Sequence, residues 1–201
     1  MFTGIVKETG KIKEIGRKSE DYILTVEVSK GFLKDVKEGD SISVDGVCLT
    51  VEKVWESFMR FYALSQSAEK TIIRFYSKND EVNLEKSMRI DDRFGGHMIL
   101  GHVDTTGYVK RIIKPNRNKL EIEIDVGSKF SKYLVENDSI SVNGISLTIK
   151  SVFENSFVLN IIPETIKITN LKNLNVGERV NVEINQITKS VYKFLKEKNN
   201  V

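Results

Sequence analysis

The chain has 201 residues, a formal net charge of +3 and a hydrophobic fraction of 40%; this is the balance of an ordinary globular protein with one large domain or two small ones. Lysines and acidic residues are interspersed, which argues against a nucleic-acid partner, and no apolar run reaches the roughly 18 residues that span a membrane. The N-terminal residues lack the basic flank and apolar run of a signal peptide, and the single cysteine, Cys48, forms no disulfide within the chain. We therefore expect a cytoplasmic protein.

Strand patterns recur along the chain. Residues 22–28 (YILTVEV) and 118–126 (NKLEIEIDV) alternate apolar and polar side chains, which predicts half-buried strands. Each is followed by a short helical pattern, at 30–38 and at 128–136, with its apolar residues on one face. The polar run around Pro115 predicts a hairpin turn. Many short strands separated by turns predict a small barrel or sandwich in each half.

The chain also repeats its own sequence after 98 residues. DSISVDGVCLT, at residues 40–50, returns as DSISVNGISLT at 138–148, and similar pairs of segments match near the start and end of each half. A period of this length is too long for a solenoid and fits two tandem domains. We predict a first domain at residues 1–97, a second at 98–185 and a C-terminal segment at 186–201. A duplicated fold without functional meaning is the alternative.

The C-terminal segment matches neither repeat. Its apolar residues fall at helical spacing, which predicts a helix with one apolar stripe: Ile187, Val191, Phe194 and Leu195. The stripe either packs on its own domain or binds identical neighbouring chains, and spacing alone favours neither.

The repeated phrase predicts two matched polar surfaces. Because side chains of a strand point alternately to opposite faces, Leu49 and its apolar neighbours enter the core while Cys48 and Thr50 face out. By the same argument, Ser146 and Thr148 face out in the second half. Either strand alone reads as ordinary structure; the matched pair favours a site.

Both histidines lie in the stretch GGHMILGH. A metal site is not expected, because one thiol and two imidazoles five residues apart do not form a ligand pattern. His97 reads as a structural histidine. His102 takes the place that Ile5 has in the first half, so one half carries an acid–base group that the other lacks. An unperturbed imidazole pKa of about 6.5 suits proton transfer near neutrality.

Five motifs together closely resemble the riboflavin synthase family of the trimeric alpha-chain type: MFTGIV, GVCLTV, GGHMILGHVD, NGISLTI and IIPETIKITNL. The resemblance covers essentially the whole chain, in order. It implies two tandem six-stranded Greek-key barrels and a C-terminal helix that bundles three subunits into a homotrimer.

The resemblance also implies the reaction. Each barrel binds one molecule of 6,7-dimethyl-8-ribityllumazine, and the first barrel of one subunit faces the second barrel of its neighbour. One lumazine gives a four-carbon unit to the other, yielding riboflavin and 5-amino-6-ribitylaminouracil without a cofactor. Association with a lumazine synthase shell is a further partner that the family suggests.

By resemblance, the catalytic residues are Cys48, His102, Ser146 and Thr148. The resemblance assigns to the first pocket Gly4, Ile5, Val6, Thr50, Gly101 and Val103. It assigns to the second pocket Ile162, Pro163, Glu164 and Thr165. Further substrate contacts are expected at Leu49, Tyr62, Ala63, Leu64, Ser65, Gln66, Ser67, Asn137, Leu147, Asn160, Ile161 and Asn185.

Four of these positions depart from the family pattern. Gln66 and Ser67 stand where a Glu-Thr pair is common, Asn185 replaces an Asp, and Asn137 replaces a Lys. The changes at Gln66, Asn137 and Asn185 favour a lumazine- or flavin-binding carrier without catalysis, which is the main alternative to an enzyme. A structural trimer without any ligand is a third reading, which leaves the matched polar faces unexplained.

Overall fold

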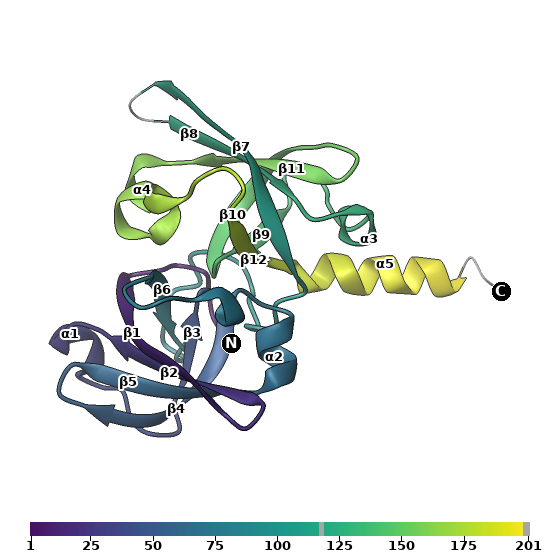
Figure 1. Ribbon diagram of the computed structural model, residues 1–201. Coiled ribbons are helices and arrows are strands. Elements are labelled where there is room, and N and C mark those ends of the chain that lie inside the picture. The colour runs from purple at the N-terminus through teal and green to yellow at the C-terminus, as the bar shows by residue number, and fades with distance from the viewer. Residues whose placement is uncertain (117–118, 199–201) are drawn as a thin grey trace.

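The computed structural model describes residues 1–116 and 119–198. The described chain forms two closed barrels of six antiparallel strands, one above the other in Figure 1, and a helix at the C-terminus. The first barrel contains β1 (Glu8–Lys18), β2 (Asp21–Glu27), β3 (Ser41–Val44), β4 (Val47–Trp55), β5 (Phe58–Ala63) and β6 (Glu81–Lys86). The second contains β7 (Thr105–Asn116), β8 (Lys119–Asp125), β9 (Ser139–Val142), β10 (Ile145–Val152), β11 (Ser156–Ile161) and β12 (Arg179–Ile184).

The two barrels share one topology. The order around the first is β1-β2-β5-β4-β3-β6, and the second repeats it as β7-β8-β11-β10-β9-β12. Three strands joined by hairpins, with an earlier strand returning to their side, make a Greek key. The predicted fold of two tandem Greek-key barrels is therefore confirmed. The tip of the hairpin predicted around Pro115 falls at residues 117–118, outside the described part of the chain, while Pro115 itself belongs to β7.

Short helices link the strands at equivalent places in both halves. They are α1 (Lys30–Leu33), α2 (Ser65–Glu69), η1 (Ile73–Phe75), α3 (Ser128–Ser131), α4 (Pro163–Ile168) and η2 (Asn170–Asn173). Phe32 of α1 and Leu134 after α3 are buried, as their one-sided apolar patterns predict. Each barrel then encloses its own apolar core, built from the inward side chains of its strands.

The turns of the two repeated phrases meet where the barrels touch. A Cβ on Gly46 would lie 2.7 Å from the backbone nitrogen of Gly144, so only glycine permits this approach. Asn181 donates to the Asp45 carbonyl oxygen at 2.8 Å, and Asn83 donates to the Asn143 carbonyl oxygen at 2.9 Å. The duplicated phrase thus joins the two barrels about a pseudo-twofold axis.

One member of this interface is an acid. The Asp45 carboxylate accepts hydrogen bonds from the Asn83 N–H, the Asn170 amide and the Tyr76 hydroxyl, at 2.8–2.9 Å. Burial raises the Asp45 pKa to about 7, because a carboxylate loses hydration in the interior. The second repeat has the neutral Asn143 at the same place.

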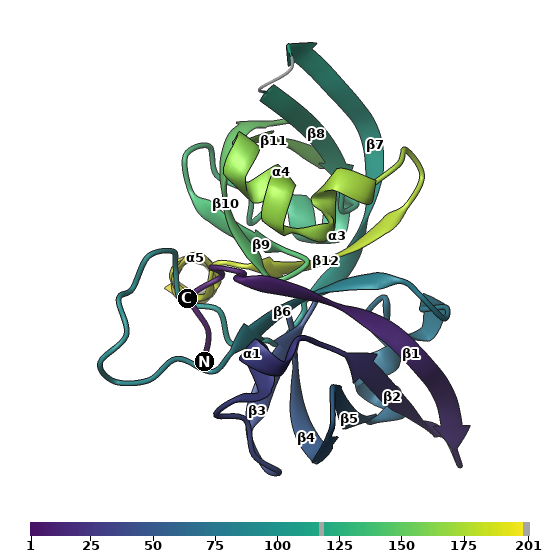
Figure 2. The same ribbon diagram turned by 90° about the vertical axis from the view of Figure 1, so that its left-hand side faces the viewer.

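The C-terminal helix α5 (Gln186–Lys198) projects away from both barrels, and Figure 2 shows it end-on. Tyr192 packs edge-on against Tyr133, at 4.8 Å between ring centroids. The predicted apolar stripe faces outward, with exposed fractions from 52% to 66%. Residues 1–116 and 119–198 therefore leave this stripe uncovered. Within the described residues, no helix has the length and apolar character needed to cross a membrane.

Candidate functional site

Two extended segments pass from one half of the molecule onto the other barrel. We call residues 3–6 the N-terminal crossing and residues 100–104 the linker crossing. They start side by side, because Phe2 and Ile99 pair through a backbone bridge. From there each crossing covers the repeated phrase of the opposite half.

The linker crossing lies on the outward face of β4. The Cys48 N–H donates to the Gly101 carbonyl oxygen at 3.0 Å, and a Cβ on Gly101 would lie 2.5 Å from the Cys48 Cβ. Gly101 also has φ +79°, which L-residues with a Cβ rarely adopt. Val103 packs against the core of the first barrel. His102, between them, is exposed at the surface beside Cys48.

The N-terminal crossing lies on β10 in the same way. The Ser146 N–H donates to the Gly4 carbonyl oxygen at 2.9 Å, and a Cβ on Gly4 would lie 2.6 Å from the Ser146 Cβ. Val6 enters the core of the second barrel, and Ile5 is exposed. Gly4, Ile5 and Val6, which the resemblance assigns to the first pocket, thus lie beside Ser146 of the second barrel in this chain. The physical reason is that residues 3–6 lie on β10 of the second barrel, although the strands that follow them in the chain build the first barrel.

Two buried carboxylates hold the crossings in place. Glu85 accepts hydrogen bonds from the Thr3 N–H, the Thr3 hydroxyl and the Gly4 N–H, at 2.7–2.9 Å. Glu183, at the same position of the second repeat, accepts from the N–H groups of Leu100 and Gly101 at 2.8 and 3.0 Å. Burial raises the pKa of Glu183. Each carboxylate therefore holds the glycine that covers the repeated phrase, Gly4 or Gly101, and the residue before it.

The strand faces agree with the alternation argument. Thr50 and Thr148 are exposed, and Cys48 and Ser146 are partly exposed under the crossings. The side chains of several predicted substrate-binding residues instead lie in the barrel cores: Leu49, Ala63, Leu147 and Ile161. Small polar side chains beside close backbone groups form a surface that hydrogen-bonds a polar ligand.

A second wall follows the ends of β5 and β11. In the first half, Asp21 accepts hydrogen bonds from the Tyr62 hydroxyl and the Ser65 N–H, both at 2.7 Å, which fixes the start of α2. Leu64 is exposed beside them. The first turn of α2 then presents Gln66 and Ser67. The hydrogen bond from the Tyr62 hydroxyl lowers the Asp21 pKa.

The second half builds the corresponding wall around α4. Asn160 and Ile162 are exposed at the end of β11, and Pro163 sits at the start of the helix with Glu164 in its first turn. Thr165 is partly exposed in the same turn. Continuing the registers Val51↔Phe61 and Ile149↔Leu159 by two residues brings these walls beside Leu49 and Leu147. Each barrel therefore gathers its predicted residues on one side.

Asn137 and Asn185 lie on either side of Asp138, which follows Asn137 in the chain and accepts a hydrogen bond from Asn185. Asn137 is exposed in a turn with φ +66°, a conformation that asparagine tolerates well. The Asn185 amide donates to Asp138 at 2.8 Å, and its oxygen accepts the N–H of Ile187 at 3.0 Å, which caps α5. In the single chain, Asn185 therefore has a structural role.

The sequence predicts a structural role for His97, and in the structure its ring contacts a predicted catalytic group. Its Nδ1 and the Ser146 Oγ share a hydrogen bond at 2.7 Å. Burial lowers the His97 pKa, so the ring is neutral at pH 7 and its Nδ1 can accept the serine proton. Sequence reasoning also missed Glu85 and Glu183. Their matching places in DEVNLE and ERVNVE were the available signal.

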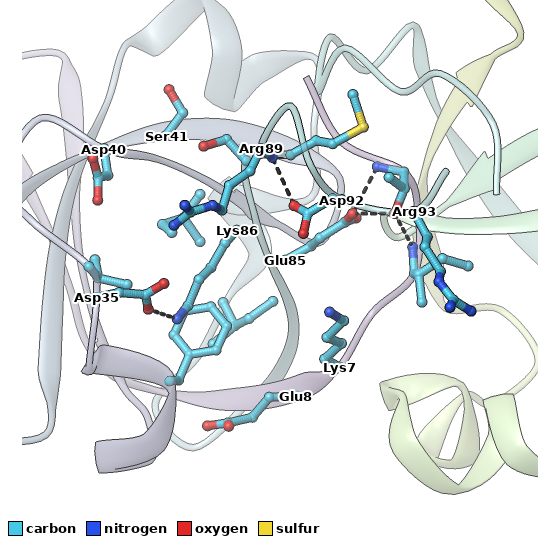
Figure 3. A pocket seen from close by; sticks show the side chains of 18 of the residues that line it. Lys7, Glu8, Asp35, Asp40, Ser41, Glu85, Lys86, Arg89, Asp92 and Arg93 are labelled. Atoms are coloured by element: carbon cyan, nitrogen blue, oxygen red, sulfur yellow. Dashed lines mark hydrogen bonds and ion pairs between the residues drawn. The ribbon is translucent and has the colours of Figure 1, made fainter. Parts of the chain in front are cut away.

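A cavity of about 960 Å³ lies beside the N-terminal crossing and is lined by residues of the segment 87–95. Figure 3 shows Glu85 in its wall, bonded to the crossing, with Lys86 paired to Asp35 nearby. Acidic and basic side chains alternate around it, and the four predicted catalytic residues lie elsewhere. The cavity therefore borders the second site through Ile5 rather than containing the chemistry.

Comparison with known proteins agrees with this geometry. The family model described as lumazine binding domain matches residues 3–87 and again 100–185. A riboflavin synthase of Actinobacillus pleuropneumoniae is 39% identical, covering 98% of this chain and 91% of its own length. A riboflavin synthase of Bacillus subtilis (strain 168) is 37% identical, covering 99% and 92%.

Solved structures share the fold. The crystal structure of LumP complexed with riboflavin superposes with a TM-score of 0.85 and 27% identity, covering 92% of this chain and 99% of that one. LumP complexed with 6,7-dimethyl-8-(1'-D-ribityl) lumazine gives a TM-score of 0.84 at 26% identity, with the same coverage. Two lumazine-binding repeats, matched over nearly their full length by such relatives, place this chain in the riboflavin synthase family.

Proposed function

We propose that this protein is a riboflavin synthase that converts two molecules of 6,7-dimethyl-8-ribityllumazine into riboflavin and 5-amino-6-ribitylaminouracil. The observation that carries the proposal is the pair of equivalent sites. Each has a small polar strand face, Cys48 with Thr50 or Ser146 with Thr148, covered by a glycine of the opposite half. Two like sites suit a reaction of two like substrates.

The reaction is the transfer of a four-carbon unit from one lumazine to the other. The atoms of two lumazines equal those of the two products, so no oxidant, reductant or other co-reactant is needed. The protein has to hold two ring systems in reacting geometry, and such orientation contributes up to about 7–11 kcal/mol to lowering a barrier.

The unequal residues of the two sites suit unequal roles. His102 is exposed next to Gly101 and is placed to move a proton at the acidic methyl group of a bound lumazine. The neutral His97 beside Ser146 suits activation of a nucleophile that adds to the other ring. Cys48 and Thr148 complete the two faces as hydrogen-bonding groups.

Assembly follows from the exposed stripe on α5. Burial of Ile187, Val191, Phe194 and Leu195 against copies of the same helix would remove this apolar surface from water. We infer a homotrimer in which the first barrel of one subunit faces the second barrel of its neighbour, so that each reaction centre takes one lumazine from each. A reducing cytoplasm suits the free thiol of Cys48.

A carrier that binds lumazine without reacting is the second candidate, because the LumP structures are so similar to this chain. Purified protein incubated with ribityllumazine, without nucleotide, metal or flavin, decides between them. The enzyme consumes two lumazines for each riboflavin and releases the ribitylaminouracil in equal amount. Tight lumazine binding with no riboflavin, even at saturating substrate, would establish the carrier.

A further inference from the structure

The linker crossing is tied to the C-terminal helix by an ion pair. The Lys189 ammonium lies 2.8 Å from both carboxylate oxygens of Asp104, the last residue of the crossing. Both side chains are largely shielded, with exposed fractions of 23% and 20%. Asp104 also accepts the Ile184 N–H at 2.8 Å, and its own N–H donates to the Val182 carbonyl oxygen at 3.0 Å. Its carboxylate is thus a fixed point to which Lys189 binds.

Lys189 also acts on the carboxylate at the other end of the crossing. Glu183 is buried and receives the N–H groups of Leu100 and Gly101. Burial raises its pKa, while the Lys189 charge favours the ionised form and the Asp104 charge opposes it. The crossing is therefore held at both ends, by Glu183 at Leu100 and Gly101 and by the ion pair of Lys189 with Asp104, and His102 lies between these attachments.

Among the described residues, nothing attaches the end of the N-terminal crossing as Lys189 attaches Asp104. Glu85 pins its start as Glu183 pins the linker crossing. At the place of Asp104, however, the first half has Lys7, which is exposed. Of the two crossings, the one that carries the imidazole is therefore the one secured by α5.

Lys189 lies on the opposite side of α5 from the apolar stripe. At about 100° per residue, it is rotated roughly 200° from Ile187 and points to the barrels. Substitution of Lys189 therefore leaves the stripe, and with it the surface for assembly, unchanged. The same helix presents one face to other chains and the opposite face to its own site.

We propose that Lys189 is a positioning residue, which holds the linker crossing on β4 through its ion pair with Asp104 and so keeps His102 over the first site. Its effect on turnover rests on the proposed function. Its effect on the crossing does not, because the crossing covers Cys48, the only thiol of the chain. Reaction of that thiol reports the position of the crossing whether or not the protein is an enzyme.

The test compares Lys189→Met with Lys193→Met on the same helix. The Lys193 side chain is 79% exposed, and its ion pair with the exposed Glu197 is long, at 3.9 Å. Its replacement removes the same charge without affecting the crossing. Iodoacetamide should alkylate Cys48 roughly fivefold faster in Lys189→Met, because the crossing opens more often. Lys193→Met should match the parent protein, and Lys189→Arg should restore most of the protection.

Turnover and assembly complete the test. Lys189→Met should lower kcat more than it raises KM, with an unchanged sedimentation coefficient and far-UV spectrum. Equal alkylation rates in Lys189→Met and Lys193→Met would overturn the positioning role. If the parent protein makes no riboflavin, the proposed function fails, and the alkylation comparison still decides the role of Lys189.

Discussion

Replacement of Gly101 by Ala tests whether the linker crossing must lie against Cys48. A Cβ at this position would meet the Cys48 Cβ at 2.5 Å, its backbone nitrogen at 2.8 Å and its Cα at 3.0 Å. These are backbone and near-backbone atoms, so no flexible chain end can move aside. The crossing itself has to shift, which breaks the hydrogen bond from the Cys48 N–H to the Gly101 carbonyl oxygen.

Gly127→Ala is the matched control. Gly127 has φ +72°, close to the +79° of Gly101, but a Cβ there meets nothing within 4 Å. Both variants place a Cβ on a residue of positive φ, which costs on the order of 1–3 kcal/mol, and only Gly101→Ala adds the contact with Cys48. In a chain of this length, about 1 kcal/mol lowers Tm by roughly 2–4 °C.

Thermal unfolding and riboflavin formation are measured on both variants. We expect Gly127→Ala to lose a few degrees of Tm and to keep its activity. Gly101→Ala should lose more stability and at least about tenfold in turnover, equivalent to about 1.4 kcal/mol of barrier. Equal losses of Tm in the two variants, with parental activity in both, would refute the contact between Gly101 and Cys48.

Three further predictions concern charge, catalysis and assembly. Burial raises the Asp45 pKa from 3.8 to about 7, so between these pH values the folded state keeps a proton that the unfolded state releases. The free energy of unfolding therefore declines as the pH rises from 3.8 to about 7. Asp45→Asn, which copies Asn143, should gain stability relative to the parent by up to about 1.4 kcal/mol per pH unit between pH 5 and 7 in urea titrations; parallel curves would contradict this. His102→Gln and Cys48→Ala should each lower turnover at least about tenfold with Tm nearly unchanged, whereas a collapse of Tm with normal activity per folded molecule would make them core residues. Deletion from Gln186 onward should lower oligomeric state and activity together in ultracentrifugation and assay, and a fully active truncated trimer would disprove it.

Local patterns predicted the elements of this fold well. The alternation in VDGVCLTV and VNGISLTI correctly separated the buried Leu49 and Leu147 from the outward polar residues, because strand side chains alternate by geometry. The spacing of the C-terminal stripe predicted α5, but not its direction, since spacing contains no information about which surface a helix faces. In the structure the stripe faces outward, and no part of the described chain covers it.

The paths of the two crossings could not be predicted from the sequence. A duplication makes Gly4 and Gly101 equivalent, so sequence alone does not say which barrel each segment covers. That choice depends on the Phe2–Ile99 pairing and on Glu85 and Glu183, contacts between residues more than 80 positions apart. For the same reason, the stretch GGHMILGH did not predict the hydrogen bond between His97 and Ser146, which are 49 positions apart.

The central claim is that two lumazines react with each other, and isotope labelling tests it most directly. The protein is given an equal mixture of unlabelled lumazine and lumazine with 13C in the four carbons that are transferred. Mass spectrometry then measures how many labelled four-carbon units each riboflavin contains. Because each riboflavin takes one four-carbon unit from each of two molecules, the half-labelled product should be the most abundant. Riboflavin found only as fully labelled and fully unlabelled species, or no riboflavin at all, would contradict the account.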